Sequence, residues 1–361
     1  MKILLCGGGT AGHVNPALSI AEVIEKNIPN VDFLYVVTPK GIENRLVKYN
    51  KVALDVEGFN SKNLFLVAKK IYKTFRAVKS SEKIIREYSP DLIIGTGGYS
   101  CFPIVYAGKK LGVKIALHES NSVPGKTIRL CAKKADVLFL NFKECGKFFS
   151  PRCNVVFSGN PLRGKFGEYT KHELREKFKI QEKYVVLCYG GSLGAERIND
   201  EVLRFIKNVL ITTKEIRLIW ATGKKDYSRI ENILRKESLL RLSNLDFREY
   251  IENMPEIMSM SDVVICRAGA MSISELVACK KSSILIPSPN VADDHQYKNA
   301  RMLEEKKASY LLKEEDIHNL NKILMELLEN ENKRKEFENN LAQFFVKDSK
   351  KIILKHILNI L

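Results

Sequence analysis

The chain has 361 residues, of which 45% are apolar, so it is too long for one hydrophobic core and has the composition of a globular protein. Its eight cysteines lack the paired spacing of a disulfide framework or a zinc site. No segment has the apolar length of a membrane span or of a secretory signal, so we expect a cytoplasmic protein. The net charge of +17 is concentrated in residues 1–160, which contain 24 Lys and Arg against 12 Asp and Glu. Such a charge favours a polyanionic partner, which can be nucleic acid, anionic lipid or a phosphorylated substrate.

Short apolar runs alternate with longer amphipathic stretches, which is the pattern of repeated strand–helix–strand units. The first predicted strands are residues 3–6, 33–37, 91–95, 113–117, 136–140 and 154–157. Glycine and proline at 159–164 interrupt the pattern, so we expect the interdomain linker there. Further runs at 184–189, 217–221, 262–266 and 284–287 restart it and predict a second parallel sheet.

The predicted fold is α/β, with two Rossmann-like, doubly wound parallel-sheet domains that face a cleft. We expect residues 1–160 to form the first domain and residues 161–344 the second. The apolar helical pattern at 345–361 predicts a C-terminal helix that docks back on the first domain. Each domain begins with a glycine turn between a strand and a helix, at 7–12 and at 190–194, where unpaired N–H groups can bind an anion.

The first glycine turn, Gly-Gly-Gly-Thr-Ala-Gly at 7–12, matches the dinucleotide fingerprint, which is a weak signal alone. A dinucleotide site needs an acidic residue at the end of the second strand, but Thr38-Pro39-Lys40 follows that strand. Another anionic ligand is therefore favoured, with a purely structural turn as the alternative. His13 follows the turn, where nearby amides would keep its imidazole neutral, as a general base requires; helix capping is the alternative role.

The second domain repeats this design at residues 267–275, where a small-residue turn follows a strand and opens a helix. Glu275 lies one helical turn inside and can accept hydrogen bonds from both ribose hydroxyls, although a carboxylate there also compensates the helix dipole. The polar stretch at 286–300 then leads into another helix. Its short polar side chains, Asp293 and Asp294 among them, bind sugar hydroxyls or cap the helix.

Residues 62–86 carry eight Lys and Arg against one glutamate, and their apolar residues recur at helical spacing. The stripe, which includes Phe75 and Val78, is typical of a face packed on the core. Phe65 and Leu66 lie off the stripe beside positive charge, which predicts reversible binding to anionic lipid headgroups. The predicted membrane patch comprises Leu64, Phe65, Leu66, Lys69, Lys70, Lys73 and Arg76. Nucleic acid is disfavoured as a partner, because no recognised nucleic-acid module accompanies the charge.

Seven motifs follow one another over nearly the whole chain. They are Gly-Gly-Gly-Thr-Ala-Gly-His-Val at 7–14, Gly-Thr-Gly-Gly-Tyr at 95–99, His-Glu-Ser-Asn at 118–121, Gly-Asn-Pro-Leu-Arg at 159–163, Gly-Gly-Ser-Leu-Gly-Ala at 190–195, Arg-Ala-Gly-Ala-Met-Ser-Ile-Ser-Glu at 267–275 and Asp-Asp-His-Gln at 293–296. Together they resemble glycosyltransferase family 28, whose fold is GT-B. The resemblance implies inverting transfer of N-acetylglucosamine from UDP-N-acetylglucosamine to lipid I (undecaprenyl-diphosphate-N-acetylmuramoyl-peptide), which forms lipid II in peptidoglycan synthesis.

On the donor side, the resemblance implies that Ser192 and the amides around it hold the UDP diphosphate, that Glu275 holds the ribose and that the backbone of Ile251 contacts uracil. The full donor set is Thr10, Ala11, Gly12, Asn121, Arg163, Ser192, Leu193, Gly194, Ile251, Met254, Ala270, Met271, Ser272, Glu275, His295 and Gln296. Leu193 and His295 depart from the family pattern, because relatives often have glutamine at the first position and some have it at the second.

On the acceptor side, the resemblance implies that three loops receive the lipid diphosphate and the sugar hydroxyl. The acceptor set is Gly9, Thr10, His13, Gly97, Gly98, Tyr99 and Asn121. His13 is the candidate general base, and Glu119 is the second candidate for catalysis. In this mechanism the acceptor hydroxyl attacks the anomeric carbon in a single displacement as UDP leaves.

No Asp-x-Asp pair occurs in the chain, so we predict metal-independent transfer without a cofactor, in which helix N-termini and an arginine stabilise the departing UDP. The expected partners are UDP-N-acetylglucosamine, lipid I, an anionic membrane surface and enzymes of cell-wall synthesis. The expected location is peripheral, at the cytoplasmic face of the cell membrane. UDP-sugar epimerases and other lipid-glycosylating transferases are the nearest rivals; a nucleotide-dependent oxidoreductase and a non-catalytic membrane module are more distant ones.

Overall fold

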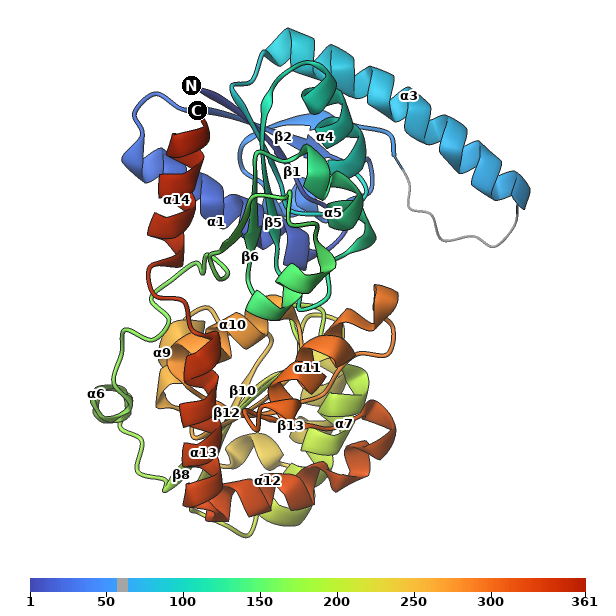
Figure 1. Ribbon diagram of the computed structural model, residues 1–361. Coiled ribbons are helices and arrows are strands. Elements are labelled where there is room, and N and C mark those ends of the chain that lie inside the picture. The colour runs from blue at the N-terminus through green and yellow to red at the C-terminus, as the bar shows by residue number, and fades with distance from the viewer. Residues whose placement is uncertain (57–63) are drawn as a thin grey trace. The chain divides into compact units, whose positions relative to one another are not determined.

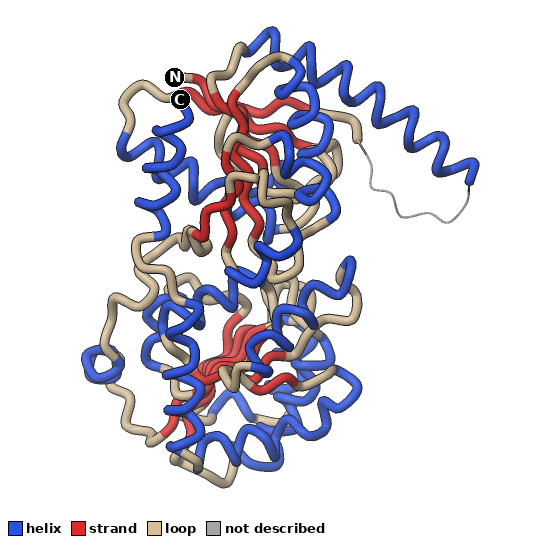
Figure 2. The backbone as a smooth tube through the Cα atoms, viewed as in Figure 1, coloured by secondary structure: helices blue, strands red, loops and turns tan. Residues whose placement is uncertain are grey.

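The computed structural model describes the backbone of residues 1–56 and 64–361, and their side chains except those of 64–72 and 292. The chain divides into two compact units (Figure 1). Unit 1 comprises Met1–Leu162 and Val346–Leu361, and unit 2 comprises Arg163–Phe345. In each unit helices flank a parallel sheet (Figure 2), which confirms the predicted class of two doubly wound α/β domains.

Unit 1 is built on a seven-stranded parallel sheet in the order β3-β2-β1-β4-β5-β6-β7. Its strands are β1 (Lys2–Cys6), β2 (Asp32–Val37), β3 (Asn50–Ala53), β4 (Leu92–Gly95), β5 (Lys114–Glu119), β6 (Val137–Leu140) and β7 (Val155–Phe157). The strand order reverses between β1 and β4, so the connections after these strands run to opposite faces of the sheet. Such a switch point leaves room for a ligand at the carboxyl edge of the sheet.

The helices of unit 1 cover both faces of its sheet. They are α1 (Ala11–Asn27), α2 (Glu43–Leu46), α3 (Leu64–Tyr88), α4 (Cys101–Lys110), α5 (Lys126–Cys131) and α14 (Ser349–Ile360), with the 3-10 turns η1 (Ala132–Lys134) and η2 (Lys143–Phe148). Side chains of α3, α4 and α5 share one hydrophobic cluster, and those of α1 and α14 share the other. Ile353 and Ile357 of α14 are buried, and this helix packs against α1 and β6.

Unit 2 is built on a six-stranded parallel sheet in the order β10-β9-β8-β11-β12-β13. Its strands are β8 (Tyr184–Tyr189), β9 (Ile216–Ala221), β10 (Leu245–Arg248), β11 (Val263–Cys266), β12 (Ser282–Leu285) and β13 (Tyr310–Leu311). Its helices are α6 (Lys171–Lys177), α7 (Glu196–Phe205), α8 (Tyr227–Lys236), α9 (Met254–Met260), α10 (Ala270–Cys279), α11 (His295–Glu305), α12 (Leu320–Glu329) and α13 (Glu331–Leu341), with the short turns η3 (Ile206–Leu210), η4 (Leu239–Arg241), η5 (Ala292–Asp294), η6 (Glu314–Asn319) and η7 (Ala342–Phe344). Its order reverses between β8 and β11, which gives this sheet a switch point as well.

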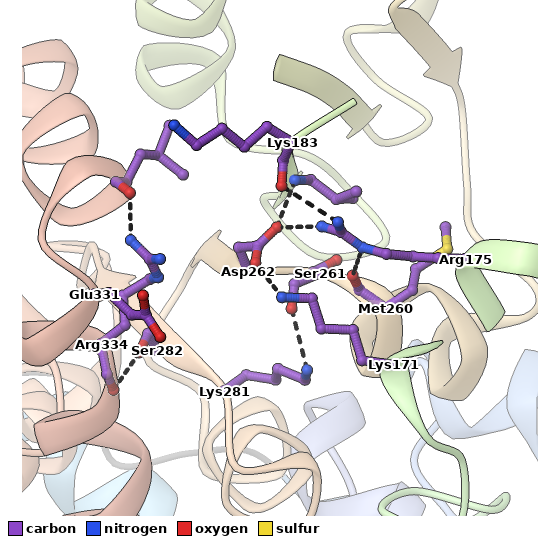
Figure 3. Close-up of polar contacts among 12 residues, drawn as sticks. Lys171, Arg175, Lys183, Met260, Ser261, Asp262, Lys281, Ser282, Glu331 and Arg334 are labelled. Carbon is purple, nitrogen blue, oxygen red and sulfur yellow. Dashed lines mark hydrogen bonds and ion pairs between the residues drawn. The ribbon is translucent and has the colours of Figure 1, made fainter. Parts of the chain in front are cut away.

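Asp262 ties helix α6 to the amino edge of the unit 2 sheet (Figure 3). Its carboxylate is 5% exposed and accepts a hydrogen bond from the Val185 N–H at 2.7 Å. The same carboxylate pairs with Lys171 and Arg175, both from α6. If α6 moved away, the buried carboxylate of Asp262 would lose both cations and its charge would be left uncompensated, which is costly. These ion pairs therefore anchor the first helix of unit 2 to the sheet.

Three strands, β3, β10 and β13, are missing from the sequence prediction. Each lies at an edge of its sheet, and most of its residues are half-buried or exposed. A strand in the centre of a parallel sheet is buried on both faces and forms a continuous apolar run, whereas an edge strand does not need one. The sequences Asn-Lys-Val-Ala of β3 and Leu-Asp-Phe-Arg of β10 therefore carry no strand signal.

Candidate active site

Two loops at the carboxyl edge of the unit 1 sheet bring predicted acceptor residues together. The Gly8 N–H, after β1, donates to the Gly97 carbonyl, after β4, at 3.3 Å. A Cβ atom on Gly98 would lie 2.2 Å from the Gly8 oxygen, and Gly98 has a φ of +82°. Only glycine permits both this backbone conformation and this close approach. Tyr99 follows with its ring partly exposed.

His13 lies in the first turn of α1, and its ring packs against the Gly97 loop. Its Nδ1 atom is 2.9 Å from the Gly8 carbonyl oxygen and 3.3 Å from the Thr10 hydroxyl. A carbonyl only accepts, so Nδ1 carries the hydrogen and the lone pair of the neutral ring lies on Nε2. A Cβ atom on Gly97 would lie 3.1 Å from Nε2. The tautomer that this geometry selects is the one that accepts a proton at Nε2.

Glu119 closes β5 and holds the loop that follows it. Its Oε1 accepts hydrogen bonds from the Asn121 backbone N–H at 2.9 Å and from the Asn121 amide at 3.0 Å, and its Oε2 accepts the Gly125 N–H at 2.8 Å. Burial raises the pKa of Glu119, and these donors oppose that shift. Both oxygens are thus engaged within the protein, which fits a role in shaping the loop; its catalytic role stays a prediction.

Two buried residues beside these loops are missing from the predicted site. His118 Nε2 is 3.2 Å from the Gly159 carbonyl at the linker, and burial lowers the pKa of His118 to about 4, which keeps it neutral. Glu43 accepts a hydrogen bond from the Gly9 N–H at 3.2 Å. The position of His118 in the His-Glu-Ser-Asn motif was a usable signal, whereas Glu43 lies outside every motif.

The second glycine turn, in unit 2, presents its tip to solvent. Gly191 and Gly194 have φ values of +92° and +88°, and the Gly194 N–H donates to the Gly191 carbonyl at 3.0 Å. A Cβ atom on Gly194 would lie 2.2 Å from the Thr222 carbonyl oxygen. Ser192 and Leu193 at the tip are exposed. The turn therefore has a backbone conformation fixed by glycine and a solvent-exposed tip, as an anion-binding loop requires.

Helix α10 begins beside the end of β11, with Ala270, Met271 and Ser272 in its first turn. Glu275 follows on the same helix with a half-buried side chain. Within the described residues its carboxylate has no hydrogen-bond partner, and burial raises its pKa to about 8. A ligand with two hydroxyl groups could donate a hydrogen bond to each oxygen of this carboxylate and so stabilise its ionised form.

Four members of the predicted donor set, Thr10, Ala11, Gly12 and Asn121, lie in unit 1, and their donor role stays a prediction. The other members lie at loop and helix starts of unit 2. Ile251 is buried in the loop after β10, and Met254 opens α9. Gln296 Oε1 accepts the Ser288 N–H at 2.8 Å, so this glutamine also holds the loop after β12. Asp294 precedes α11 but makes no capping hydrogen bond. The remaining members in unit 2, His295 at the start of α11 and the exposed Arg163 at the start of the unit, keep their roles as predictions.

No metal site is found in the described part of the chain, where no three His, Cys, Asp or Glu side chains are grouped to hold an ion.

The predicted membrane patch lies on α3, and much of it falls outside the described side chains. This applies to Leu64, Phe65, Leu66, Lys69 and Lys70. Lys73 pairs with Asp55 at 2.9 Å, and Arg76 is exposed. Phe75, expected on the core-facing stripe, is 69% exposed, because α3 packs instead through residues such as Ile84 and Ile85. Among the helices in the described ranges, none has the length and apolarity to cross a membrane.

Comparison with known proteins places both units in one enzyme family. The glycosyltransferase family 28 N-terminal domain model matches residues 3–140, and the C-terminal domain model matches residues 185–353. A curated relative from Acetivibrio thermocellus is 36% identical over 367 residues, which cover 100% of this chain and 98% of that protein. It is named UDP-N-acetylglucosamine–N-acetylmuramyl-(pentapeptide) pyrophosphoryl-undecaprenol N-acetylglucosamine transferase.

Solved structures share the fold at lower identity. Acinetobacter baumannii MurG superposes with a TM-score of 0.77 and 22% identity over 99% of both chains. A UDP-GlcNAc 2-epimerase from Neisseria meningitidis, bound to UDP-GlcNAc, superposes with a TM-score of 0.62 and 14% identity over 99% of this chain and 100% of that one. At such identities the likeness shows the fold alone, and the family follows from the two domain models and the full-length relative. The chain belongs to glycosyltransferase family 28.

Proposed function

We propose that this protein transfers N-acetylglucosamine from UDP-N-acetylglucosamine to lipid I and forms lipid II, with inversion at the anomeric carbon. The observation that carries the proposal is the 36% identity, over the full length, to a relative whose name states this transferase activity. The rival UDP-sugar epimerase activity has a fold neighbour at only 14% identity. The two glycine turns and Glu275 support a site for an activated, phosphorylated sugar.

Unit 2 is the proposed donor-binding unit. The outward backbone of the turn at 190–194 and the first turn of α10 offer N–H groups to the UDP diphosphate. Glu275 has no partner in the described structure and would accept both ribose hydroxyls. Ala270, Met271 and Gln296 would line the sugar. A helix N-terminus stabilises an anionic group by about 0.3 to 2 kcal/mol, which helps UDP to leave without a metal ion.

Unit 1 is the proposed acceptor-binding unit, and His13 is the proposed general base. Its Nδ1 hydrogen is committed to the Gly8 carbonyl, so Nε2 would take the proton from the acceptor hydroxyl. The resulting oxygen attacks the anomeric carbon while the bond to the UDP oxygen breaks on the opposite face, which inverts the configuration. Thr10 and the loops at 95–99 and 118–121 would hold the lipid diphosphate and the acceptor sugar.

We also propose that unit 1 binds peripherally to the anionic cytoplasmic face of the cell membrane, where cell-wall synthesis enzymes would be partners. Helices α3, α4 and α5 pack along one face of the sheet (Figure 1). They expose Phe75, Tyr106 and Leu130 among basic residues. The exposed basic residues of α4, α5 and η1 are Lys109, Lys110, Lys126, Arg129 and Lys133. Apolar side chains within a basic surface suit insertion among anionic headgroups, and each Lys or Arg adds about 1 kcal/mol.

Vesicle flotation tests the membrane proposal. The protein should float with vesicles that contain anionic lipid and should not float with phosphatidylcholine alone, and salt should weaken the binding. Replacing Phe75 and Leu130 by Ser should reduce binding. Ile211→Ser is the matched control, because it removes an exposed apolar residue from unit 2. An equal loss of vesicle binding in the control, or equal binding of the unsubstituted protein to both vesicle types, would contradict the proposed membrane surface.

UDP release from UDP-N-acetylglucosamine, with a short-chain lipid I analogue as acceptor, tests the transferase proposal. Release should require the acceptor, should persist in EDTA and should yield a disaccharide of inverted anomeric configuration. Formation of an epimerised UDP-sugar without acceptor would instead identify an epimerase. No reaction, despite UDP binding to the folded protein, would reject lipid I as the acceptor.

A further inference from the structure

The carboxylate of Glu43 lies against the glycine turn of unit 1. Glu43 is the first residue of α2 and is fully buried. Its Oε1 accepts hydrogen bonds from the Thr38 N–H at 2.9 Å and the Thr38 hydroxyl at 2.6 Å, and its Oε2 accepts the Gly9 N–H at 3.2 Å. Burial opposes ionisation, but these donors outweigh it and lower the pKa of Glu43, so the group is an anion at neutral pH.

Two glycines make room for this carboxylate. A Cβ atom on Gly8 would lie 2.9 Å from Glu43 Oε1, and one on Gly41 would lie 1.9 Å from the same oxygen. Glu43 therefore fills the space that side chains at these two positions would occupy. With both oxygens engaged inside the protein, this acidic residue near the second strand is not available to bind a ribose.

A single peptide group connects Glu43 to His13. The N–H of Gly9 and the C=O of Gly8 belong to the same peptide unit. Its N–H donates to the Glu43 carboxylate at 3.2 Å, and its C=O accepts from His13 Nδ1 at 2.9 Å. Turning this peptide over would break both hydrogen bonds, so the two side chains fix its orientation together.

The carboxylate also changes the electronic character of this peptide. An anion that accepts a hydrogen bond from a peptide N–H polarises the amide and makes its carbonyl oxygen a stronger acceptor. The carbonyl of Gly8 then holds the Nδ1 hydrogen of His13 more firmly and stabilises positive charge on the ring when Nε2 takes a proton. A carboxylate bonded directly to the imidazole has this effect in the Ser-His-Asp arrangement.

We propose that Glu43 is a positioning residue for His13, which acts through the peptide group between Gly8 and Gly9. The role rests on the proposed function, in which His13 deprotonates the acceptor. Glu43 selects the His13 tautomer with the lone pair on Nε2 and supports the charge that forms there. It touches neither substrate, and its influence is confined to the acceptor side of the reaction.

Glu43→Gln tests the charge while it preserves the size of the side chain. One amide N–H₂ would then face a backbone or hydroxyl donor, so the bond to Gly9 or to Thr38 is lost. We expect kcat to fall by about tenfold or more, as when a partner that orients a histidine is removed. The KM for UDP-N-acetylglucosamine should stay unchanged, and the acidic limb of the kcat profile should move to lower pH. An unchanged kcat and pH profile would overturn the proposal.

Asp136→Asn is the matched control. Asp136 accepts the Ile115 N–H at 2.8 Å at the amino edge of the same sheet, so the substitution also removes a carboxylate from a backbone N–H, but far from His13 along the strands. It should change stability without shifting the pH profile. Equal kinetic effects in both variants would reduce Glu43 to a general structural role and overturn the proposal.

Nitrogen-15 NMR of the unsubstituted protein tests the connection without any acceptor, and a variant serves only to assign the histidine signal. His13, assigned through His13→Gln, should show the neutral tautomer with hydrogen on Nδ1, and the Gly9 amide shift should follow its titration. The opposite tautomer, or a Gly9 amide that ignores the titration, would overturn the proposal. Because this readout needs no transfer, it separates failure of the positioning role from failure of the proposed function.

Discussion

Glu275 gives the sharpest prediction for the donor site, because UDP binding should depend on its ionisation. Its half-buried carboxylate has no hydrogen-bond partner in the described structure, and burial raises its pKa to about 8. Ribose hydroxyls donate hydrogen bonds, so they bind the ionised carboxylate better than the protonated acid. UDP should therefore release a proton from Glu275 on binding and should bind more tightly as pH rises.

The magnitude follows from the fraction of Glu275 that is ionised before UDP binds. With a pKa of about 8, roughly a tenth of the carboxyl is ionised at pH 7 and half at pH 8. The association constant for UDP should rise by about fivefold from pH 7 to pH 8 and by about twofold more to pH 9. The second ionisation of a phosphate group lies at about pH 6, so the charge on the UDP diphosphate changes little between pH 7 and pH 8, where most of the rise is expected.

Isothermal titration calorimetry in two buffers of different ionisation enthalpy measures both the affinity and the protons released. We expect a release of nearly one proton per UDP at pH 7 and almost none at pH 9. Glu275→Gln should bind UDP more weakly at pH 9 and should show a flat profile with no proton release. A flat profile in the unsubstituted protein, or the same profile in the Gln variant, would refute the reasoning.

Other predictions concern stability, the general base, the second glycine turn and the ion pairs of Asp262. Without UDP, Glu275→Gln should melt at a higher temperature than the unsubstituted protein at pH 8.5, and the difference should vanish below pH 4.5. The pKa of Glu275 is higher in the folded protein than in the unfolded chain, so the unsubstituted protein loses stability as pH rises between these two pKa values. His13→Ala should lower kcat by about 10² to 10⁴ and leave UDP affinity unchanged in calorimetry; unchanged turnover would remove it as the base. Gly194→Ala should abolish tight UDP binding, because its Cβ would lie 2.2 Å from the Thr222 oxygen; retained affinity would show that the turn is not the diphosphate site. Asp262→Ala should destabilise unit 2 by about 3 to 5 kcal/mol in urea unfolding, because Lys171 and Arg175 lose their shared partner; a loss under about 1 kcal/mol would contradict the anchoring role.

Local sequence was sufficient to predict the central strands and the two glycine turns. Residues of β1, β4 and β8 are buried on both sheet faces, so their apolar runs are visible without the fold. The turns are visible because glycine is required where the backbone takes a positive φ or passes close to another chain segment, as at Gly98 and Gly194. The family resemblance followed from the order of these same motifs.

The predicted role of α3 shows where local pattern fails. Helical spacing placed Phe75 on a core-facing stripe, but in the structure it is 69% exposed. The amphipathic pattern of a long basic helix is the same whether its apolar face packs on a sheet or meets a membrane. Only the position of α4 and the sheet decides which part of α3 is covered.

Hydrophobic periodicity and the positions of glycine were enough to predict the fold class, the two sheets and the loops that we propose bind the substrates. Which polar groups come into contact depends on how the strands and loops pack in three dimensions. Glu43 stands outside every motif, yet it shares one peptide group with His13, because β2 and β1 are neighbours in the sheet and their following loops converge. A hydrogen bond between residues about thirty positions apart produces no pattern in the local sequence, so its partners can be identified only once the strands are paired in register.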